Sequence, residues 1–285
     1  MCAELAIEPA IRAGAVLEID LAAIVANWRA LAARVAPSSC AAVVKADAYG
    51  LGAAQVAAAL AAAGCRLFFV ATLDEAIALR RSLDKTSEIA VFNGPIAGSA
   101  RDMAARGFIP VLNHPGQIAE WKAVVGGCAA PPAILHIDTG MARLGLTAPE
   151  FDRLADEPEA CDGIRWRGMI SHLACADEPR HPLNETQRKR FIAARNRLDG
   201  MPASLAASSG IFLGRSFHFD FVRPGAALYG VNPQPGSENP MRPVVRLSAR
   251  ILQIRELEAD EPVGYGATHR MSARGRLATV AAGYA

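Results

Sequence analysis

The sequence has few of the features that metal, disulfide-bonded and membrane proteins require. Its 285 residues include six cysteines, yet no two form a CxxC pair and no cysteine–histidine cluster has the spacing of zinc ligands. The alanine-rich stretch at 53–63 is too short and too weakly apolar to span a membrane. The N-terminus lacks a basic segment followed by an apolar core, so we expect no signal peptide. We therefore expect a cytoplasmic protein with reduced thiols, no metal site and no membrane partner.

An excess of one charge is also missing. The formal net charge is +2, and the basic residues are scattered, so we expect no nucleic-acid partner. Only four of the 30 basic residues are lysines. One of them, Lys45, ends a short apolar run and precedes a glycine-bearing turn. A lysine at the rim of a buried strand is easily desolvated, which lowers its pKa and makes it nucleophilic. The local sequence is equally consistent with a structural role, in which the side chain of Lys45 extends from a strand end so that its amine reaches solvent.

Apolar runs alternate with amphipathic helical segments from about residue 41 to residue 225. We expect strands at 41–45, 67–71, 88–92, 109–112, 133–138, 167–173, 203–207 and 219–223. The helices between them have caps: Thr72 opens a helix over 73–83, Asn184 opens one that runs to residue 198, and Gly64 and Gly107 end two others. Eight strands that alternate with helices predict an α/β fold, a (β/α)8 TIM barrel rather than an open sheet.

The pattern changes after Pro243. Residues 244–257 and 276–282 have the pattern of strands with no helix between them. We expect a barrel over residues 1–241 and the start of an all-β domain over 242–285, which the alternating segment 16–21 also joins. A β domain of roughly forty residues with open edges is poorly stable alone, so we expect a truncated sequence.

Chemistry-bearing residues follow five of the expected strands. Active sites of such barrels lie at the C-terminal ends of the strands, so these side chains are expected around one mouth: Lys45, Arg143, His172, Ser209 and Arg223. Each alone has a structural explanation, because a buried histidine is usually a satisfied core residue and a strand-end arginine a surface charge. Their convergence is what predicts a site.

The ends of the last two strands carry a possible phosphate site. Ser209, Gly210, Gly225 and Ala226 offer a hydroxyl and backbone N–H groups where barrels often bind phosphate. Isolated glycines more often only shape turns. A reactive lysine beside a phosphate site predicts a phosphorylated aldehyde or sugar as ligand, and pyridoxal phosphate satisfies both requirements. Four tyrosines at expected turns add phenols that bind phosphate or move protons: Tyr49, Tyr229, Tyr265 and Tyr284.

Several motifs occur together in a known order: Val44-Lys45-Ala46-Asp47-Ala48-Tyr49-Gly50, Asp138-Thr139-Gly140-Met141, Val222-Arg223-Pro224-Gly225 with Tyr229-Gly230, and Val263-Gly264-Tyr265-Gly266. The chain thereby resembles alanine racemase, a barrel-type pyridoxal-phosphate enzyme. The similarity runs end to end and includes Val70-Ala71, Glu75-Ala76 and Gly283-Tyr284-Ala285.

The resemblance implies pyridoxal 5'-phosphate as cofactor, an amino-acid substrate, a homodimer, and a supply of D-alanine for peptidoglycan. Lys45 resembles the lysine that forms the Schiff base with the cofactor. Tyr265 resembles the second base, supplied to the other subunit's site. Arg143 resembles the residue that orients the cofactor phenolate and the substrate carboxylate, and Arg223 the partner of the pyridine nitrogen. The other implied cofactor contacts are Tyr49, His172, Ser209, Gly225 and Ala226.

Three departures from the family pattern matter. His136 stands where many members carry a carbamylated lysine that supports Arg143, so another anion or group must take its place. Ser208 replaces an asparagine. The chain also ends before an acidic residue and the remainder of the β domain, which supply part of the substrate pocket and dimer interface in the family.

Three alternatives to alanine racemisation remain. A basic amino-acid decarboxylase is disfavoured by Tyr265 and Arg223, since that enzyme is expected to place an acidic residue at the pyridine nitrogen. A broad-specificity racemase stays open. So does an inactive pyridoxal-phosphate-binding protein, because truncation interrupts the domain that carries Tyr265.

Overall fold

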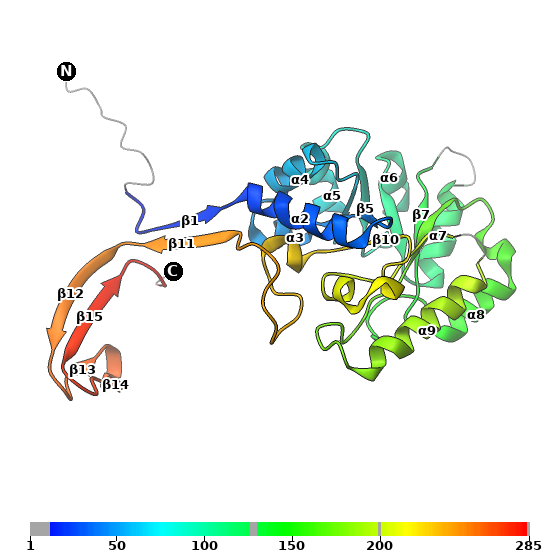
Figure 1. Ribbon diagram of the computed structural model, residues 1–285. Helices are drawn as coiled ribbons and strands as arrows, with labels where there is room; N and C mark the ends of the chain where they lie inside the picture. Colours follow the sequence, from blue (N-terminus) through cyan, green and yellow to red (C-terminus); the bar gives the residue numbers. More distant parts are fainter. Residues whose placement is uncertain (1–11, 126–129, 199–200, 284–285) are drawn as a thin grey trace, which may run out of the picture. The chain divides into compact units, whose positions relative to one another are not determined.

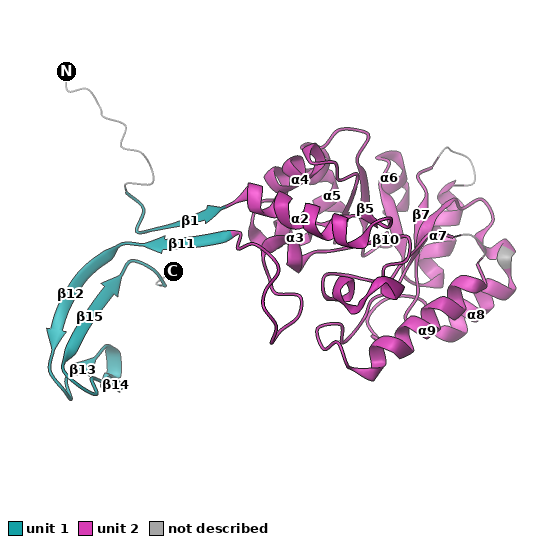
Figure 2. Cartoon of the chain, viewed as in Figure 1, with its two compact units in different colours: residues 1–19, 245–285 teal, residues 20–244 magenta. Residues whose placement is uncertain are grey.

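The computed structural model describes residues 12–125, 130–198 and 201–283. Tyr284 and Ala285, the end of the last quoted motif, lie outside this part. The described chain forms two compact units, residues 20–244 and residues 12–19 with 245–283. We call them the barrel unit and the strand unit, and Figure 2 colours them separately.

The barrel unit contains eight parallel strand positions, which confirms the expected α/β barrel (Figure 1). The first position is split into β2 (Ser39–Cys40) and β3 (Ala42–Val43). The others are β4 (Leu67–Val70), β5 (Glu88–Val91), β6 (Ile109–Leu112), β7 (Ala133–His136), β8 (Trp166–Ile170), β9 (Ala203–Ser204) and β10 (Phe221–Val222). Strands β3 to β9 pair in chain order, and β10 pairs with β2.

Backbone hydrogen bonds and one bridge close the barrel. The Ala41 N–H donates to the Val222 carbonyl and the Arg223 N–H to the Ala206 carbonyl, each at 3.0 Å. A parallel bridge also joins Ala207 to Arg223. The sheet has no open edge, so the inward side chains of successive strands form one core: Val43, Phe69, Ala90, Val111, Ile134, Ile170 and Phe221.

Several strands are shorter than expected at their C-terminal ends. Lys45 lies beyond β3 rather than in it, and β9 and β10 contain two residues each. One or two residues beyond these strands still make single inter-strand hydrogen bonds, such as that from the Ser171 N–H to the Ser204 carbonyl at 3.1 Å. The chain then forms the loops at the mouth.

Helices cover the outside of the barrel. They are α2 (Leu21–Val35), α4 (Ala53–Ala62), α5 (Leu73–Arg80), α6 (Ala100–Ala105), α7 (Pro115–Val125), α8 (Ala148–Asp156) and α9 (Pro182–Asn196). Thr72 caps α5 as expected, with its Oγ1 accepting from the Glu75 N–H at 3.2 Å. Gly64 and Gly107 follow the ends of α4 and α6 with φ of 112° and 73°.

The expected Asn184 cap is wrong. The helix begins two residues earlier, at Pro182, after His181, whose Nδ1 accepts from the Leu183 N–H at 3.2 Å. Proline is favoured at the first helical position because its φ is already suitable and it needs no N–H partner there. Asn184 is buried instead, and its Nδ2 donates to the Glu178 carbonyl at 3.0 Å.

The strand unit consists of two-stranded antiparallel pairs. β1 (Ala15–Ile19) pairs with β11 (Val245–Ala249), β12 (Ile251–Leu257) with β15 (Gly275–Val280), and β13 (Pro262–Val263) with β14 (His269–Arg270). The segment near the N-terminus is thus part of the strand unit. Among the described residues, no helix has both the length and the apolar character needed to cross a membrane.

Candidate active site

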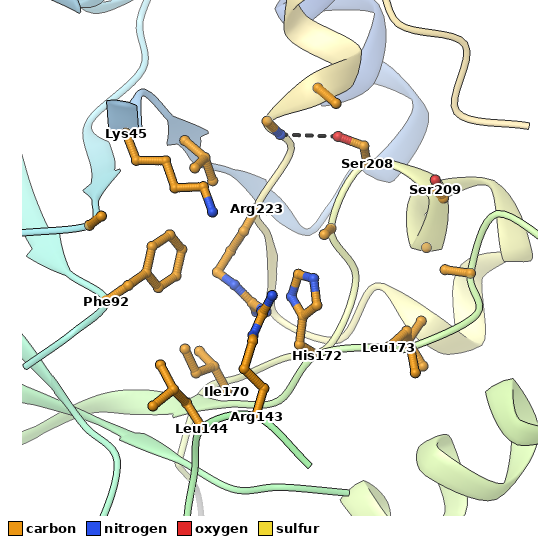
Figure 3. A pocket seen from close by; sticks show the side chains of 18 of the residues that line it. Lys45, Phe92, Arg143, Leu144, Ile170, His172, Leu173, Ser208, Ser209 and Arg223 are labelled. Atoms are coloured by element: carbon orange, nitrogen blue, oxygen red, sulfur yellow. Dashed lines mark hydrogen bonds between the residues drawn. The ribbon is translucent and has the colours of Figure 1, made fainter. Parts of the chain in front are cut away.

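A cavity of about 480 Å³ lies in the barrel unit and is lined by residues that follow the barrel strands. It is lined by eight of the barrel residues that the sequence predicted for the site: Lys45, Tyr49, Arg143, His172, Ser209, Arg223, Gly225 and Ala226. Tyr229 is not among the lining residues, and its buried hydroxyl donates to the Val43 carbonyl at 3.0 Å. In Figure 3 the side chains of Lys45, Arg143 and Arg223 extend into the same space. Tyr265 belongs to the strand unit, where its side chain is 91% exposed.

Lys45 begins a turn of unusual hand. In α3 (Lys45–Gly50) the four residues from Ala46 to Tyr49 have φ between 50° and 58°, so the turn is left-handed. The Lys45 Nζ lies 6.0 Å from the centre of the Phe92 ring. The rings of Tyr49 and Tyr229 pack in a tilted arrangement with their centres 4.9 Å apart, and burial raises the pKa of Tyr49. The turn therefore delivers both an amine and a phenol to the cavity.

The loops after β9 and β10 are joined by one serine. Ser208 Oγ accepts from the N–H groups of Gly225 and Ala227, each at 3.1 Å, and Figure 3 shows one of these two bonds. A Cβ placed on Gly225 would lie 2.4 Å from the Tyr49 hydroxyl, so only glycine lets the phenol approach the backbone here. Hydroxyl and N–H groups from three loops consequently meet at one corner of the cavity.

Arg223 is a buried cation without a carboxylate partner among the described residues. Its side chain is 2% exposed, and its guanidinium donates to the Ser204 carbonyl and hydroxyl and to the Ser171 carbonyl. Burial lowers the pKa of Arg223 to about 9, which still leaves it protonated at neutral pH. An unpaired buried charge is costly, so this site favours an electron-rich ligand atom beside the guanidinium.

Two histidines of the cavity are neutral. Burial, with Arg223 and Arg143 as further causes, lowers the pKa of both His136 and His172 to about 3. His136 Nδ1 lies 2.7 Å from Asn113 Oδ1. Because Asn113 Nδ2 already donates to two backbone carbonyls, Asn113 Oδ1 is the acceptor and His136 Nδ1 carries the hydrogen. The residue at the carbamylated-lysine position is therefore a neutral imidazole whose Nε2 is an acceptor.

Sequence reasoning did not assign roles to the residues that support this site. Ser208 joins two loops, Ser204 and Ser171 bind Arg223, and Asn113 fixes the tautomer of His136. Asn113 directly follows β6, so the strand-end criterion that found the other residues also applies to it. Ser171 directly follows β8 and Ser208 follows β9, so the same criterion locates these two serines. It does not reveal their roles, because their partners follow other strands.

The lining of the cavity is basic. It contains three cationic side chains, those of Lys45, Arg143 and Arg223, and one acidic side chain, that of Asp177. The closed (β/α)8 barrel places a lysine after its first strand and hydrogen-bond donors after its last two strands. This arrangement is typical of a barrel enzyme that binds a small anionic ligand.

Residues 19–233 match the alanine racemase N-terminal domain, and residues 244–285 match the alanine racemase C-terminal domain. The chain is 50% identical to the catabolic alanine racemase of Mesorhizobium japonicum over 274 residues, 96% of this chain and 72% of that protein. It is also 50% identical to the alanine racemase of Rhodospirillum rubrum, with 96% and 74% covered. The solved alanine racemase from Bartonella henselae, with covalently bound pyridoxal phosphate, has a TM-score of 0.89, 42% identity, and 94% and 75% coverage. The chain therefore belongs to the alanine racemase family.

Proposed function

We propose that this protein is a pyridoxal-phosphate-dependent racemase that interconverts L-alanine and D-alanine with Lys45 and Tyr265 as its two bases. The observation that carries the proposal is the single cavity that collects Lys45, the unpaired Arg223 and the donor-rich corner at Gly225. The relatives that cover most of the chain are alanine racemases. The product, D-alanine, would supply peptidoglycan synthesis.

The residues of the cavity fit the cofactor. Pyridoxal phosphate supplies an aldehyde that condenses with amines and a conjugated ring that stabilises negative charge at the substrate α-carbon. Lys45 would hold it covalently. The Tyr49 hydroxyl, Ser209 and the Ala226 N–H would hold its phosphate, where the absent Cβ of Gly225 leaves room. The Gly225 N–H itself already donates to Ser208 Oγ.

Arg223 and His172 would line the ring of the cofactor. A guanidinium with a pKa of about 9 donates a hydrogen bond at neutral pH but does not give up its proton readily. Arg223 would therefore donate to the ring nitrogen without protonating it, which would make the cofactor a weaker electron acceptor. This favours return of a proton to the α-carbon over side reactions.

The proton transfers need one base on each face of the α-carbon. Lys45 lies on the barrel unit, and Arg143 would orient the substrate carboxylate within the same cavity. The neutral Nε2 of His136 is available as an acceptor beside this basic lining. We propose that Tyr265 of a second subunit supplies the other base, so that the active form is a homodimer. A phenol needs surroundings that lower its pKa to act as a base at neutral pH.

Reduction with borohydride in the presence of pyridoxal phosphate tests the cofactor site. We expect one equivalent of cofactor on Lys45, located by peptide mass spectrometry, and none after Lys45→Ala. Lys122, which donates to the Glu159 carbonyl, serves as the matched control through Lys122→Ala. Stoichiometric labelling of any other lysine would contradict the assignment.

Incubation with L-alanine in deuterated water tests the reaction. We expect deuterium at the α-carbon together with D-alanine. Exchange without D-alanine indicates that only one of the two bases works, and thus a cofactor-binding protein that does not racemise. Loss of carbon dioxide would reject racemisation in favour of decarboxylation.

A further inference from the structure

The left-handed turn after Lys45 needs support from outside itself. Ala46, Asp47, Ala48 and Tyr49 all have positive φ, although none is glycine. An L-residue is disfavoured in this region because its Cβ crowds the backbone, and a run of four is rarer still. Such a conformation persists only where surrounding contacts determine it.

Glu75 makes such contacts from the neighbouring helix α5. It lies in the first turn of α5, where its own N–H is bonded to Thr72 Oγ1 at 3.2 Å. One carboxylate oxygen accepts from the Ala46 N–H at 3.0 Å, and the other accepts from the Ala71 N–H at 2.7 Å. The carboxylate thus joins the chain after β3 to the chain after β4.

The chemistry of this bridge requires a carboxylate. Both partners are N–H donors, and an ionised glutamate accepts at both oxygens. A glutamine of the same shape accepts at one oxygen only, and its amide nitrogen would face the second N–H donor. The far end of the turn is fixed separately, because Asp47 Oδ1 accepts from the Ala53 N–H at 2.7 Å.

The two ends of the turn have different consequences. The bridge holds the amide directly after Lys45, and therefore the direction in which the Lys45 side chain leaves the backbone. The same rigid turn places Tyr49 against Gly225, where the phenol oxygen lies 2.4 Å from the position that a Cβ would take.

We propose that Glu75 is a positioning residue whose carboxylate clamps the strained turn and thereby aims Lys45 and Tyr49 into the cavity. This inference rests on the proposed function in so far as Lys45 is the residue that binds pyridoxal phosphate. Glu75 itself is not among the residues that line the cavity, so it acts through the turn.

Hydrogen exchange of the full chain without cofactor tests the clamp directly. For Glu75→Gln we expect the amides of Ala46 and Ala71 to exchange about tenfold faster than in the wild type, because each opening then loses a charge-assisted hydrogen bond. Asp74→Asn is the matched control: it removes the same charge from the same helical turn at an exposed residue with no hydrogen bond among the described residues. It should leave both amides at the wild-type rate.

Trapping of pyridoxal phosphate on Lys45 by borohydride gives the second measurement. We expect trapping in Glu75→Gln to be about tenfold slower than in the wild type and in Asp74→Asn. If Glu75→Gln does not fold, Glu75→Asp replaces it, since it keeps the charge but withdraws the carboxylate by one methylene.

The outcomes separate the clamp from the proposed function. Faster exchange with slower trapping supports the clamp. Unchanged exchange, or faster exchange with trapping at the wild-type rate, overturns it. If the wild type itself fails to trap the cofactor on Lys45, the proposed function fails, and the exchange rates alone decide whether Glu75 fixes the turn.

Discussion

Single residues in the cavity carry charge states that differ from those in water. Arg223 stays cationic without a carboxylate beside it, while His136 and His172 stay neutral because burial and two nearby arginines oppose a further positive charge. The cavity thus combines permanent cations with uncharged acceptors. That combination suits a ligand with several negative or electron-rich atoms.

The neutral state of His136 makes stability depend on pH. In the unfolded chain a histidine titrates near pH 6.5, whereas in the folded chain the pKa of His136 is about 3. The unfolded state therefore binds more protons between these values, and the stability that is complete above pH 6.5 is lost as pH falls toward 3. Each such histidine removes about 1.4 kcal/mol per pH unit in this window.

His136→Gln tests this charge state, since glutamine keeps a donor for Asn113 but cannot become charged. Between pH 7.5 and pH 5.5, the variant should lose about 1.4 kcal/mol less of its free energy of unfolding than the wild type. Urea unfolding of the cofactor-free protein at both pH values measures the difference. The same loss in both proteins would show that His136 does not remain neutral.

At the scale of elements, the loops after β9 and β10 are held together by hydrogen bonds to a single side chain. Ser208, after β9, accepts from the backbone after β10, whereas the neighbouring Ser209 is left for a ligand in our proposal. Two adjacent serines therefore have separate roles, one in stability and one in binding.

Alanine substitution at each serine distinguishes the two roles. Ser208→Ala leaves two N–H groups without their acceptor and should lower the free energy of unfolding by about 1–3 kcal/mol. Ser209→Ala should leave stability nearly unchanged and weaken binding of pyridoxal phosphate about tenfold, in line with the loss of one hydrogen bond to a charged group. Thermal unfolding without cofactor and equilibrium titration with cofactor measure the two effects. A reversed pattern would exchange the roles of the two residues.

The sequence predicts elements better than it predicts their ends. Apolar runs correctly predict all eight strand positions. Each strand is covered by helices on one face and by the barrel core on the other, so its residues are apolar on both faces. The Asn184 cap fails since Pro182 starts α9 earlier. The left-handed turn is not predictable locally: Ala46 to Tyr49 contain no glycine, and the contact from Glu75 comes from helix α5. The role of Ser208 is not predictable for the same reason, because its partners follow another strand.

At the scale of the whole molecule, the strand unit has exposed apolar side chains. Its two-stranded pairs expose Leu247 by 64% and Leu252 by 65%, and the short 3-10 helix between β13 and β14 exposes Tyr265 by 91%. Isolated two-stranded pairs are at best marginally stable in water. The proposed second base therefore lies on a unit whose apolar surface is suited to burial against another part of an assembly.

A mixture of two inactive variants tests whether active sites are shared between subunits. Lys45→Ala removes the first base and Tyr265→Phe removes only the phenolic hydroxyl, so each variant alone should fail to produce D-alanine from L-alanine. If Tyr265 acts in the partner's site, a mixed dimer has one site with both substitutions and one site with neither. Random pairing of equal amounts makes about half of the dimers mixed, so about a quarter of all sites are intact and about a quarter of the wild-type activity should return.

The two variants are unfolded and refolded together, and in the control they are refolded apart and then combined. The comparison separates the formation of mixed dimers from simple addition of the two variants. Recovery near zero in the co-refolded sample, with cofactor still trapped on Lys45 of the Tyr265→Phe chains, would place both bases in one subunit or deny Tyr265 its role.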